Sequence, residues 1–153
     1  MIYRLLLAAA VLHVAEEYTR DWVGWMRTYG FVKSVTRKQF VVINALFLFL
    51  MLMSAFYGDR YPVFGLSTAA LLFINAWFHI FPSIWLGKYT PGLVTAVLLY
   101  LPLPIWAYWR VWSAGHAWSV LQISFGLGMV WMSVPLVYQG LILLGQSSGK
   151  SKP

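Results

Sequence analysis

Five long apolar stretches, separated by short polar segments, make up most of the chain. A run of about 20 apolar residues can cross a bilayer as a helix, whereas transmembrane strands are about half that length. We therefore predict an all-α fold, an integral membrane bundle with about five transmembrane helices. The predicted spans cover residues 2–17, 40–57, 63–86, 93–112 and 118–144.

The five stretches form one unit, because no soluble domain and no internal repeat separates them. We assign residues 1–145 to a single transmembrane domain. Residues 146–153 are rich in Ser, Gly and Lys, a composition that predicts a disordered cytoplasmic tail.

Two kinds of segment connect the spans. Residues 58–62 and 87–92 combine Gly and Pro as tight turns do. Thr90 and Pro91 predict the N-cap and first residue of the fourth helix, which prolines at positions 102 and 104 should break midway. Residues 18–39 instead mix aromatic and basic side chains, so we predict a loop or short helix in the lipid headgroup region.

The composition agrees with a membrane protein and excludes several classes of function. The chain is 61% hydrophobic and only 10% charged, whereas a soluble domain carries about 25% charged residues. The absence of cysteine excludes disulfide frameworks, thiolate metal sites and cysteine nucleophiles. The net charge of +7 comes from residues between the apolar runs, where they set topology and contact anionic headgroups. We therefore expect membrane lipids, and no nucleic acid, as partners.

The basic residues also predict an orientation. With five spans, three cations fall on one side of the membrane and eight on the other, and the richer side faces the cytoplasm. The N-terminus is then outside and the C-terminus cytoplasmic, and we expect a bacterial plasma (inner) membrane as the location. The outer set is Arg4, Arg60 and Arg110, and the cytoplasmic set is Arg20, Arg27, Lys33, Arg37, Lys38, Lys88, Lys150 and Lys152.

A group of ionisable residues lies at the end of the first apolar run. His13, Glu16 and Glu17 fall on one helix face within about 6 Å of axial rise, because a helix advances about 100° and 1.5 Å per residue. Ionisable groups at membrane depth are costly unless they pair, bind a ligand or face a cavity. The pattern therefore predicts a functional site.

The predicted topology brings polar residues of all five helices to one layer near the cytoplasmic end. His79 should lie at a depth similar to that of His13, on a parallel helix. Five further residues should contact the substrate or support the site: Asn44, Asn75, Tyr89, Tyr138 and Gln139.

Two histidines and two carboxylates are a ligand set typical of zinc, iron or manganese. We predict His13, Glu16 and His79 as metal ligands, with Glu17 as a fourth ligand or as an acid/base group. Either glutamate could act as general base on a water activated by the ion. The leading hypothesis is a metal-dependent membrane hydrolase that acts on a lipid or isoprenoid-like substrate.

Other interpretations of the same residues remain open. Without a metal, the cluster is an acid/base set suited to isomerisation or cyclisation. A transporter or binding protein for protons, metal ions or an amphiphile would also use such a cluster, and a homodimer could supply the pathway. In a purely structural interpretation, the acids pair with Arg20, while His79, Asn44 and Asn75 make hydrogen bonds between helices.

The sequence His13-Val-Ala-Glu16-Glu17 resembles the signature of the HXXEE family of small multi-span membrane proteins. The similarity extends to Asn75-Ala-Trp-Phe-His79 and Tyr89-Thr-Pro-Gly92, three patches within about the first 95 residues. The resemblance implies an α-helical membrane protein with these residues in its core site, and it implies no particular activity. A looser similarity, in intramembrane His and Glu with aromatic walls, links the chain to five-span sterol-isomerase and terpene-cyclase enzymes.

Overall fold

The computed structural model describes residues 1–30 and 34–149, and every regular element within these ranges is helical. This confirms the all-α prediction. The elements are α1 (Ile2–Thr19), α2 (Trp22–Tyr29), α3 (Arg37–Tyr57), α4 (Pro62–Leu86), α5 (Leu93–Thr95), the π-helical turn η1 (Ala96–Tyr100), α6 (Pro102–Ser113) and α7 (Trp118–Gly149).

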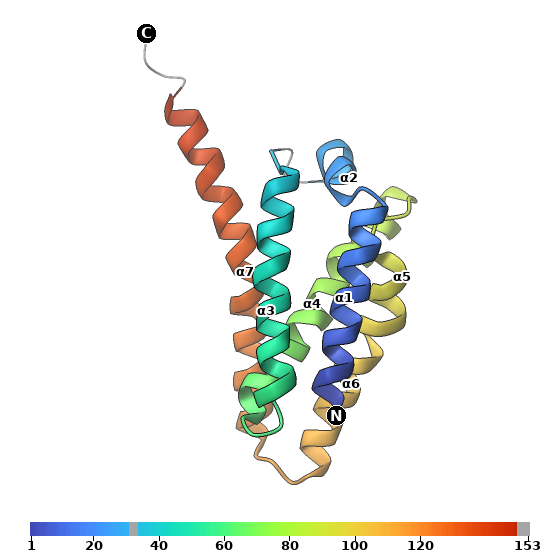
Figure 1. The fold of residues 1–153 in the computed structure, drawn as a ribbon, viewed down its shortest axis with the longest axis vertical. Helices are drawn as coiled ribbons and strands as arrows, with labels where there is room; N and C mark the ends of the chain where they lie inside the picture. Colours follow the sequence, from blue (N-terminus) through green and yellow to red (C-terminus); the bar gives the residue numbers. More distant parts are fainter. Residues whose placement is uncertain (31–33, 150–153) are drawn as a thin grey trace.

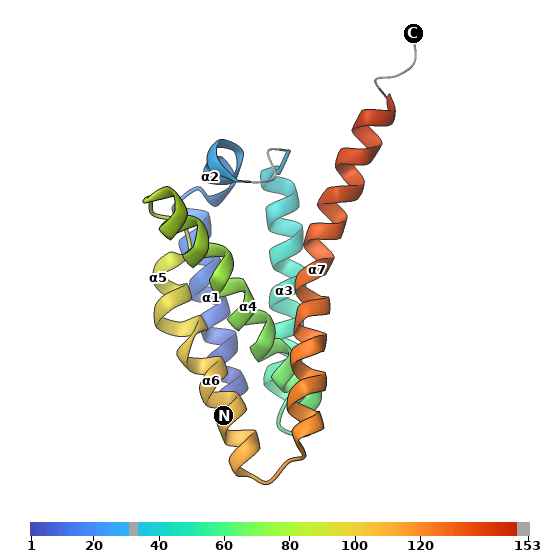
Figure 2. The same ribbon diagram turned by 180° about the vertical axis from the view of Figure 1, so that it is seen from behind.

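The long helices alternate in direction (Figure 1). Helix α1 rises from the N-terminus, α3 returns, α4 rises again, the segment α5–η1–α6 descends and α7 rises. Helix α2 and the loop 87–92 consequently lie at the same end of the molecule, which we call the α2 end. Figure 2 shows α4 running diagonally across the bundle, from α7 at the opposite end to α5 at the α2 end.

Among the described residues, three helical segments are long and apolar enough to cross a membrane: Arg37–Tyr57, Pro62–Leu86 and Leu93–Ser113. Large apolar side chains on their outer faces are exposed, including Phe49, Leu98 and Trp109. Exposed apolar surface of this extent is typical of a protein that faces lipid. Helix α1 is shorter and carries three charged residues.

Small residues allow the helices to approach closely, as is common in membrane bundles. A Cβ atom at Gly128 of α7 would lie 2.4 Å from the Cβ of Ala70 on α4. A Cβ at Gly65 would lie 2.4 Å from the ring of Tyr3. The core around these contacts includes Leu6, Ala10, Met51, Leu66, Leu72 and Ala76, all fully buried.

A buried set of hydroxyl groups links α3, α4 and α7. We call Ser54, Ser67, Thr68 and Trp131 the hydroxyl cluster. The hydroxyl groups of Ser54 and Thr68 are 2.7 Å apart, and Thr68 also donates to the Gly65 carbonyl at 2.8 Å. Ser67 donates to the carbonyl of residue 64 and accepts from the indole N–H of Trp131. Each polar group of the cluster thus has a partner.

The aromatic and basic segment after α1 contains the short helix α2, one of the two predicted forms. The Asp21 carboxylate accepts a hydrogen bond from the backbone N–H of Gly24 and caps the helix. Thr36 and Gln39 form a capping box at the start of α3. Arg27 of α2 donates to the carbonyl of Val35, which lies just before the N-cap of α3, at 2.8 Å.

The fourth span differs from the prediction at its start. The helix begins at Leu93, with Gly92 as N-cap at φ 95°, so the predicted start at Thr90 and Pro91 is wrong. The Thr90 hydroxyl is instead bound to Ser83. The predicted break is confirmed: Pro102 begins α6, and before it the N–H of Leu101 donates to the carbonyl of Ala96, five residues back.

The last helix is longer than predicted. Helix α7 continues to Gly149, which places residues 146–149 of the predicted tail in a helix. Residues 150–153 lie outside the described part of the chain.

Candidate functional site

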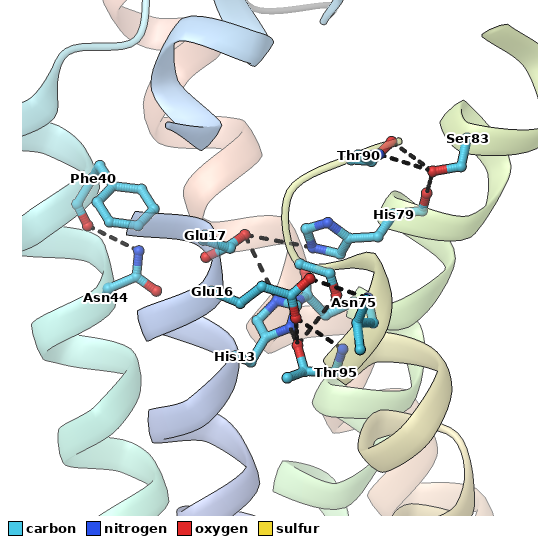
Figure 3. A network of polar contacts seen from close by, with 12 residues as sticks. His13, Glu16, Glu17, Phe40, Asn44, Asn75, His79, Ser83, Thr90 and Thr95 are labelled. Atoms are coloured by element: carbon cyan, nitrogen blue, oxygen red, sulfur yellow. Dashed lines mark hydrogen bonds and ion pairs between the residues drawn. The ribbon is translucent and has the colours of Figure 1, made fainter. Parts of the chain in front are cut away.

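Three ligand-type side chains meet near the α2 end: His13 and Glu17 of α1 and His79 of α4 (Figure 3). We call them the His–Glu group. One ligand atom from each lies within 4.8 Å of the other two. Glu17 Oε1 is 3.6 Å from His13 Nε2 and 3.4 Å from His79 Nε2. The imidazole rings meet edge to face, with centroids 4.7 Å apart.

The group is buried, with exposed fractions of 1% for His13, 7% for Glu17 and 2% for His79. His13 and Glu17 share a face of α1 because they are four residues apart, and α4 crosses that face at His79. A buried carboxylate needs hydrogen-bonding, charged or metal partners. The groups nearest to the Glu17 carboxylate are one nitrogen of His13 and one of His79.

A chain of hydrogen bonds orients His13. Thr95 Oγ1 lies 2.8 Å from His13 Nδ1 and 2.6 Å from Glu16 Oε2, to which its hydroxyl donates. Because the single hydroxyl proton points to Glu16, Thr95 accepts the Nδ1–H of His13. The lone pair on Nε2 then faces Glu17, and the amide of Asn75 donates to it at 3.2 Å. This tautomer is the one in which Nε2 can bind a metal ion.

Glu16 is not a member of the His–Glu group, but it is linked to His13 through the Thr95 hydroxyl. Its carboxylate accepts hydrogen bonds from the backbone N–H groups of Val94 (3.1 Å) and Thr95 (2.8 Å), and from the hydroxyls of Thr95 and Tyr89. Helix N-termini carry unpaired N–H groups and a partial positive charge, so a carboxylate stabilises them. Glu16 of α1 therefore caps the fourth span, and this explains why that helix begins at Leu93.

The contact with Glu16 also affects Tyr89. Partial burial, together with the hydrogen bond to Glu16, raises the pKa of the Tyr89 phenol from 10.0 to about 12. The neutral phenol is therefore the form that donates to Glu16 over the physiological pH range.

The loop 87–92 covers the His–Glu group through Gly92. A Cβ atom at Gly92 would lie 2.8 Å from Cε1 of both His13 and His79, and its φ of 95° is a conformation that favours glycine. Ser83 holds the same loop to α4, donating to the His79 carbonyl at 2.7 Å and accepting from the Thr90 N–H at 3.2 Å. Glycine at position 92 thus allows the backbone to close over both rings.

Tyr100 forms another wall of the site. Its ring stacks on His13 at a centroid distance of 4.3 Å, and its side chain is fully buried. Its hydroxyl has no hydrogen-bond partner among residues 1–30 and 34–149. Tyr100 belongs to the π-helical turn η1, a type of turn found frequently at functional sites.

The structure places the residues proposed from the sequence in different environments. It brings together His13, Glu17 and His79, with Asn75 in contact, while Glu16 and Tyr89 bind each other beside the start of α5. Asn44 donates to the carbonyl of Phe40 on its own helix, and within the described residues it makes no hydrogen bond to the group. Tyr138 is exposed on α7, and the side chain of Gln139 lies outside the described residues.

Three residues of the site were missed by sequence reasoning: Gly92 as a close-approach glycine, Thr95 and Tyr100. The motif Tyr89-Thr-Pro-Gly92 contains the signal for Gly92: we interpreted it as a turn and as part of the family resemblance, but did not predict that the glycine contacts both imidazole rings. Thr95 and Tyr100 lie within an apolar run where no spacing distinguishes them.

No curated protein and no solved structure matches the chain. A family model described as a protein of unknown function with HXXEE motif matches residues 4–107, more than half of the chain. The matched range contains the His–Glu group, Glu16, Gly92 and Thr95. The chain therefore belongs to this family, the proteins of unknown function with the HXXEE motif.

Proposed function

We propose that the protein is a small integral-membrane enzyme that binds one divalent metal ion and hydrolyses a lipid or isoprenoid-like substrate. The observation that supports it is the convergence of two imidazole nitrogens and one carboxylate oxygen within 4.8 Å in a buried site. Catalytic zinc sites use three protein ligands of these types and leave one position open, whereas structural sites are closed by four. Iron and manganese accept the same ligand types.

A five-span topology is part of the proposal. Five long helical segments alternate in direction. Three of them are long and apolar enough to cross a membrane, and in the proposal α1 and α7 cross it as well. Among the described residues, the α2 end then has five basic side chains and the other end has three. They are Arg20, Arg27, Arg37, Lys38 and Lys88 at the α2 end, and Arg4, Arg60 and Arg110 at the other. The excess of cations supports a cytoplasmic α2 end. The site would open toward that leaflet.

Each residue has a distinct role in the proposed site. His13, Glu17 and His79 hold the ion, and Thr95 keeps His13 in the tautomer that binds it. Glu16 keeps Thr95 in place by capping the fourth span, and is reassigned here from ligand to support. A bound ion would act as a Lewis acid and lower the pKa of a water molecule, which suits hydrolysis.

A second candidate is supported by the contacts of Glu17. Its Oε1 lies within 3.6 Å of both imidazole nitrogens, so the carboxylate and rings can share a proton without an ion. Such a set can donate a proton at one face of a substrate and remove one at another, as isomerisation and cyclisation require.

Elemental analysis of the protein purified in neutral detergent tests the metal proposal. We expect about one zinc, iron or manganese ion per chain, lost in His13→Ala and His79→Ala. His116→Ala is the matched control, because the third histidine is exposed in the connection between α6 and α7, at the other end of the bundle. Ion content that survives both site substitutions would contradict the proposal.

Activity separates the two candidates. Metal-dependent cleavage of an amphiphilic ester or phosphoester, abolished by Glu17→Gln and retained by His116→Ala, would support the hydrolase. A stable, metal-free protein in which Glu17→Gln abolishes isomerisation or cyclisation of an isoprenoid-like probe would support the acid/base enzyme instead.

A further inference from the structure

A small pocket lies between α1, α2 and the start of α3, beside the His–Glu group. Its volume is about 110 Å³, and Glu17 forms part of its wall. Glu17 therefore belongs to both the pocket and the His–Glu group. A ligand in this pocket would approach the group from the α2 end.

The pocket contains an arginine with free hydrogen-bonding capacity. Arg37 Nη2 is 3.6 Å from Asp21 Oδ1, too far for a hydrogen bond, and the Arg37 side chain is 77% exposed. The guanidinium makes no hydrogen bond to another residue in the described part of the chain. A guanidinium presents a planar fork of donors that matches the oxygen pairs of phosphate groups.

The two acids of the pocket do not exclude an anion. Glu17 Oε1 points at the two histidines, and in the proposed function it shares a divalent ion with them. The Asp21 carboxylate accepts from the Gly24 N–H and forms a 3.6 Å ion pair with one nitrogen of Arg37, so a bound phosphate would share the guanidinium with it. The remaining charged side chains exposed at this end are cations, including Arg20, Lys38 and Lys88.

Aromatic side chains complete the pocket. Trp22 and Phe40 line it, with ring centroids 5.6 Å apart. In the proposed topology this level of the bundle lies where headgroups meet hydrocarbon, because α2 and the basic residues are at the cytoplasmic surface. A molecule with a charged head and an apolar tail can place its head in the pocket and its tail in the bilayer.

We propose that this pocket binds the phosphate head of an amphiphile, held by the Arg37 guanidinium beside the metal-facing Glu17. The proposal rests on the proposed function and names its substrate class: a phosphate-bearing amphiphile that enters from the cytoplasmic leaflet. Arg37 is then a specificity-determining residue for that substrate.

The test is calorimetric titration of the full-length, metal-loaded protein in neutral detergent with dodecyl phosphate. Arg37→Gln should weaken binding by about tenfold or more, because it removes charge-assisted hydrogen bonds. Lys38→Gln is the matched control: it removes the same charge from the next exposed residue of α3, which does not line the pocket. It should weaken binding by less than about twofold, as expected for a screened surface charge.

Two further ligands identify what the pocket recognises. Dodecylphosphocholine, whose phosphate carries a bulky cation, should bind more weakly than dodecyl phosphate. Inorganic phosphate should also bind more weakly, because it lacks the tail. Equal losses in Arg37→Gln and Lys38→Gln would show a general surface charge effect and overturn the proposal. Inorganic phosphate binding as tightly as dodecyl phosphate would overturn the amphiphile assignment.

Failure of the pocket and failure of the metal site are distinguishable. If the protein holds no metal but its affinity for dodecyl phosphate still depends on Arg37 and not on Lys38, the pocket stands and the metalloenzyme fails. If the metal content is normal and Arg37→Gln binds dodecyl phosphate with the affinity of the unsubstituted protein, the pocket proposal fails and the metal proposal stands. Arg37 is exposed, so loss of the fold is not expected, and the thermal unfolding temperature of the variant checks this.

Discussion

Two buried polar clusters share helix α4 in this bundle, one with α3 and α7 and the other with α1, and they differ in how their polar atoms are paired. In the hydroxyl cluster, every hydroxyl or indole group has a hydrogen-bond partner, either within the cluster or at a backbone carbonyl. In the His–Glu group, two imidazole nitrogens and a carboxylate oxygen, all able to bind a cation, face one another. Both clusters are built on buried polar side chains, but only the His–Glu group brings together several atoms that could bind a cation.

The two adjacent glutamates show the same contrast within one turn of helix. Glu16 accepts hydrogen bonds from three residues and has little capacity for a further ligand. Glu17 makes no hydrogen bond to another described residue, and its Oε1 lies 3.6 Å from His13 Nε2 and 3.4 Å from His79 Nε2. The comparison predicts that substitutions in the His–Glu group change metal affinity, whereas those in the hydroxyl cluster change stability.

The largest effect is expected from Glu17→Gln. The substitution removes an anionic ligand, so the dissociation constant for Zn²⁺ should rise by more than the 10- to 100-fold typical of losing a partner that orients a ligand. Ser54→Ala in the hydroxyl cluster should leave the dissociation constant unchanged and lower stability by about 1 kcal/mol. Competition titration with a chromophoric chelator measures the Zn²⁺ dissociation constant of each variant. Equal dissociation constants would show that the two clusters do not differ in metal binding.

The next effect concerns the residue that orients His13. Thr95→Val removes the hydroxyl that accepts from Nδ1, and should weaken Zn²⁺ binding by about 10- to 100-fold. Thr95→Ser restores the hydroxyl and should recover most of the affinity. Thr68→Val makes the same change in the hydroxyl cluster and should reduce thermal stability without changing metal affinity. A loss of stability with unchanged affinity in Thr95→Val would assign Thr95 a purely structural role.

A smaller effect is expected at the loop that covers the group. Gly92→Ala places a methyl group against both imidazole rings at a positive φ, and should lower stability by about 1–3 kcal/mol and weaken metal binding. Gly87→Ala is the control: its φ is also positive, at 60°, but a Cβ there meets nothing within 4 Å. It should cost about 1 kcal/mol from backbone strain alone and leave metal affinity intact. Thermal unfolding and the same titration compare the two variants.

The smallest effect is a pH dependence at Tyr89. Its pKa is raised from 10.0 to about 12 in the folded protein, so its hydrogen bond to Glu16 stabilises the fold fully below pH 10. The stabilisation should decline as the pH rises from 10 and disappear above about 12. Below pH 10, the free energy of unfolding should exceed that of Tyr89→Phe by less than about 1 kcal/mol, because the Tyr89 side chain is partly exposed. Chemical unfolding of both proteins at pH 8 and pH 12 measures the difference.

Much of the fold could be predicted because hydrophobic runs and breakers act locally. The helical class, the short helix within residues 18–39 and the break at Pro102 all follow from residues close in sequence. The start of the fourth span could not be predicted from local residues. Its cap is supplied by Glu16, about 80 residues earlier, and a capping side chain from another helix overrides the local preference of Thr90 and Pro91.

Spacing along the chain is enough to place His13, Glu16 and Glu17 on one helix face at the end of an apolar run, because helical periodicity depends only on spacing. Which glutamate joins the histidines depends instead on how the other helices pack against α1. Helix α4 brings His79 to the side of Glu17, and the start of α5 brings two backbone N–H groups to the side of Glu16. Glu16 and Glu17 are the same type of residue. Their roles differ because a different helix contacts each carboxylate.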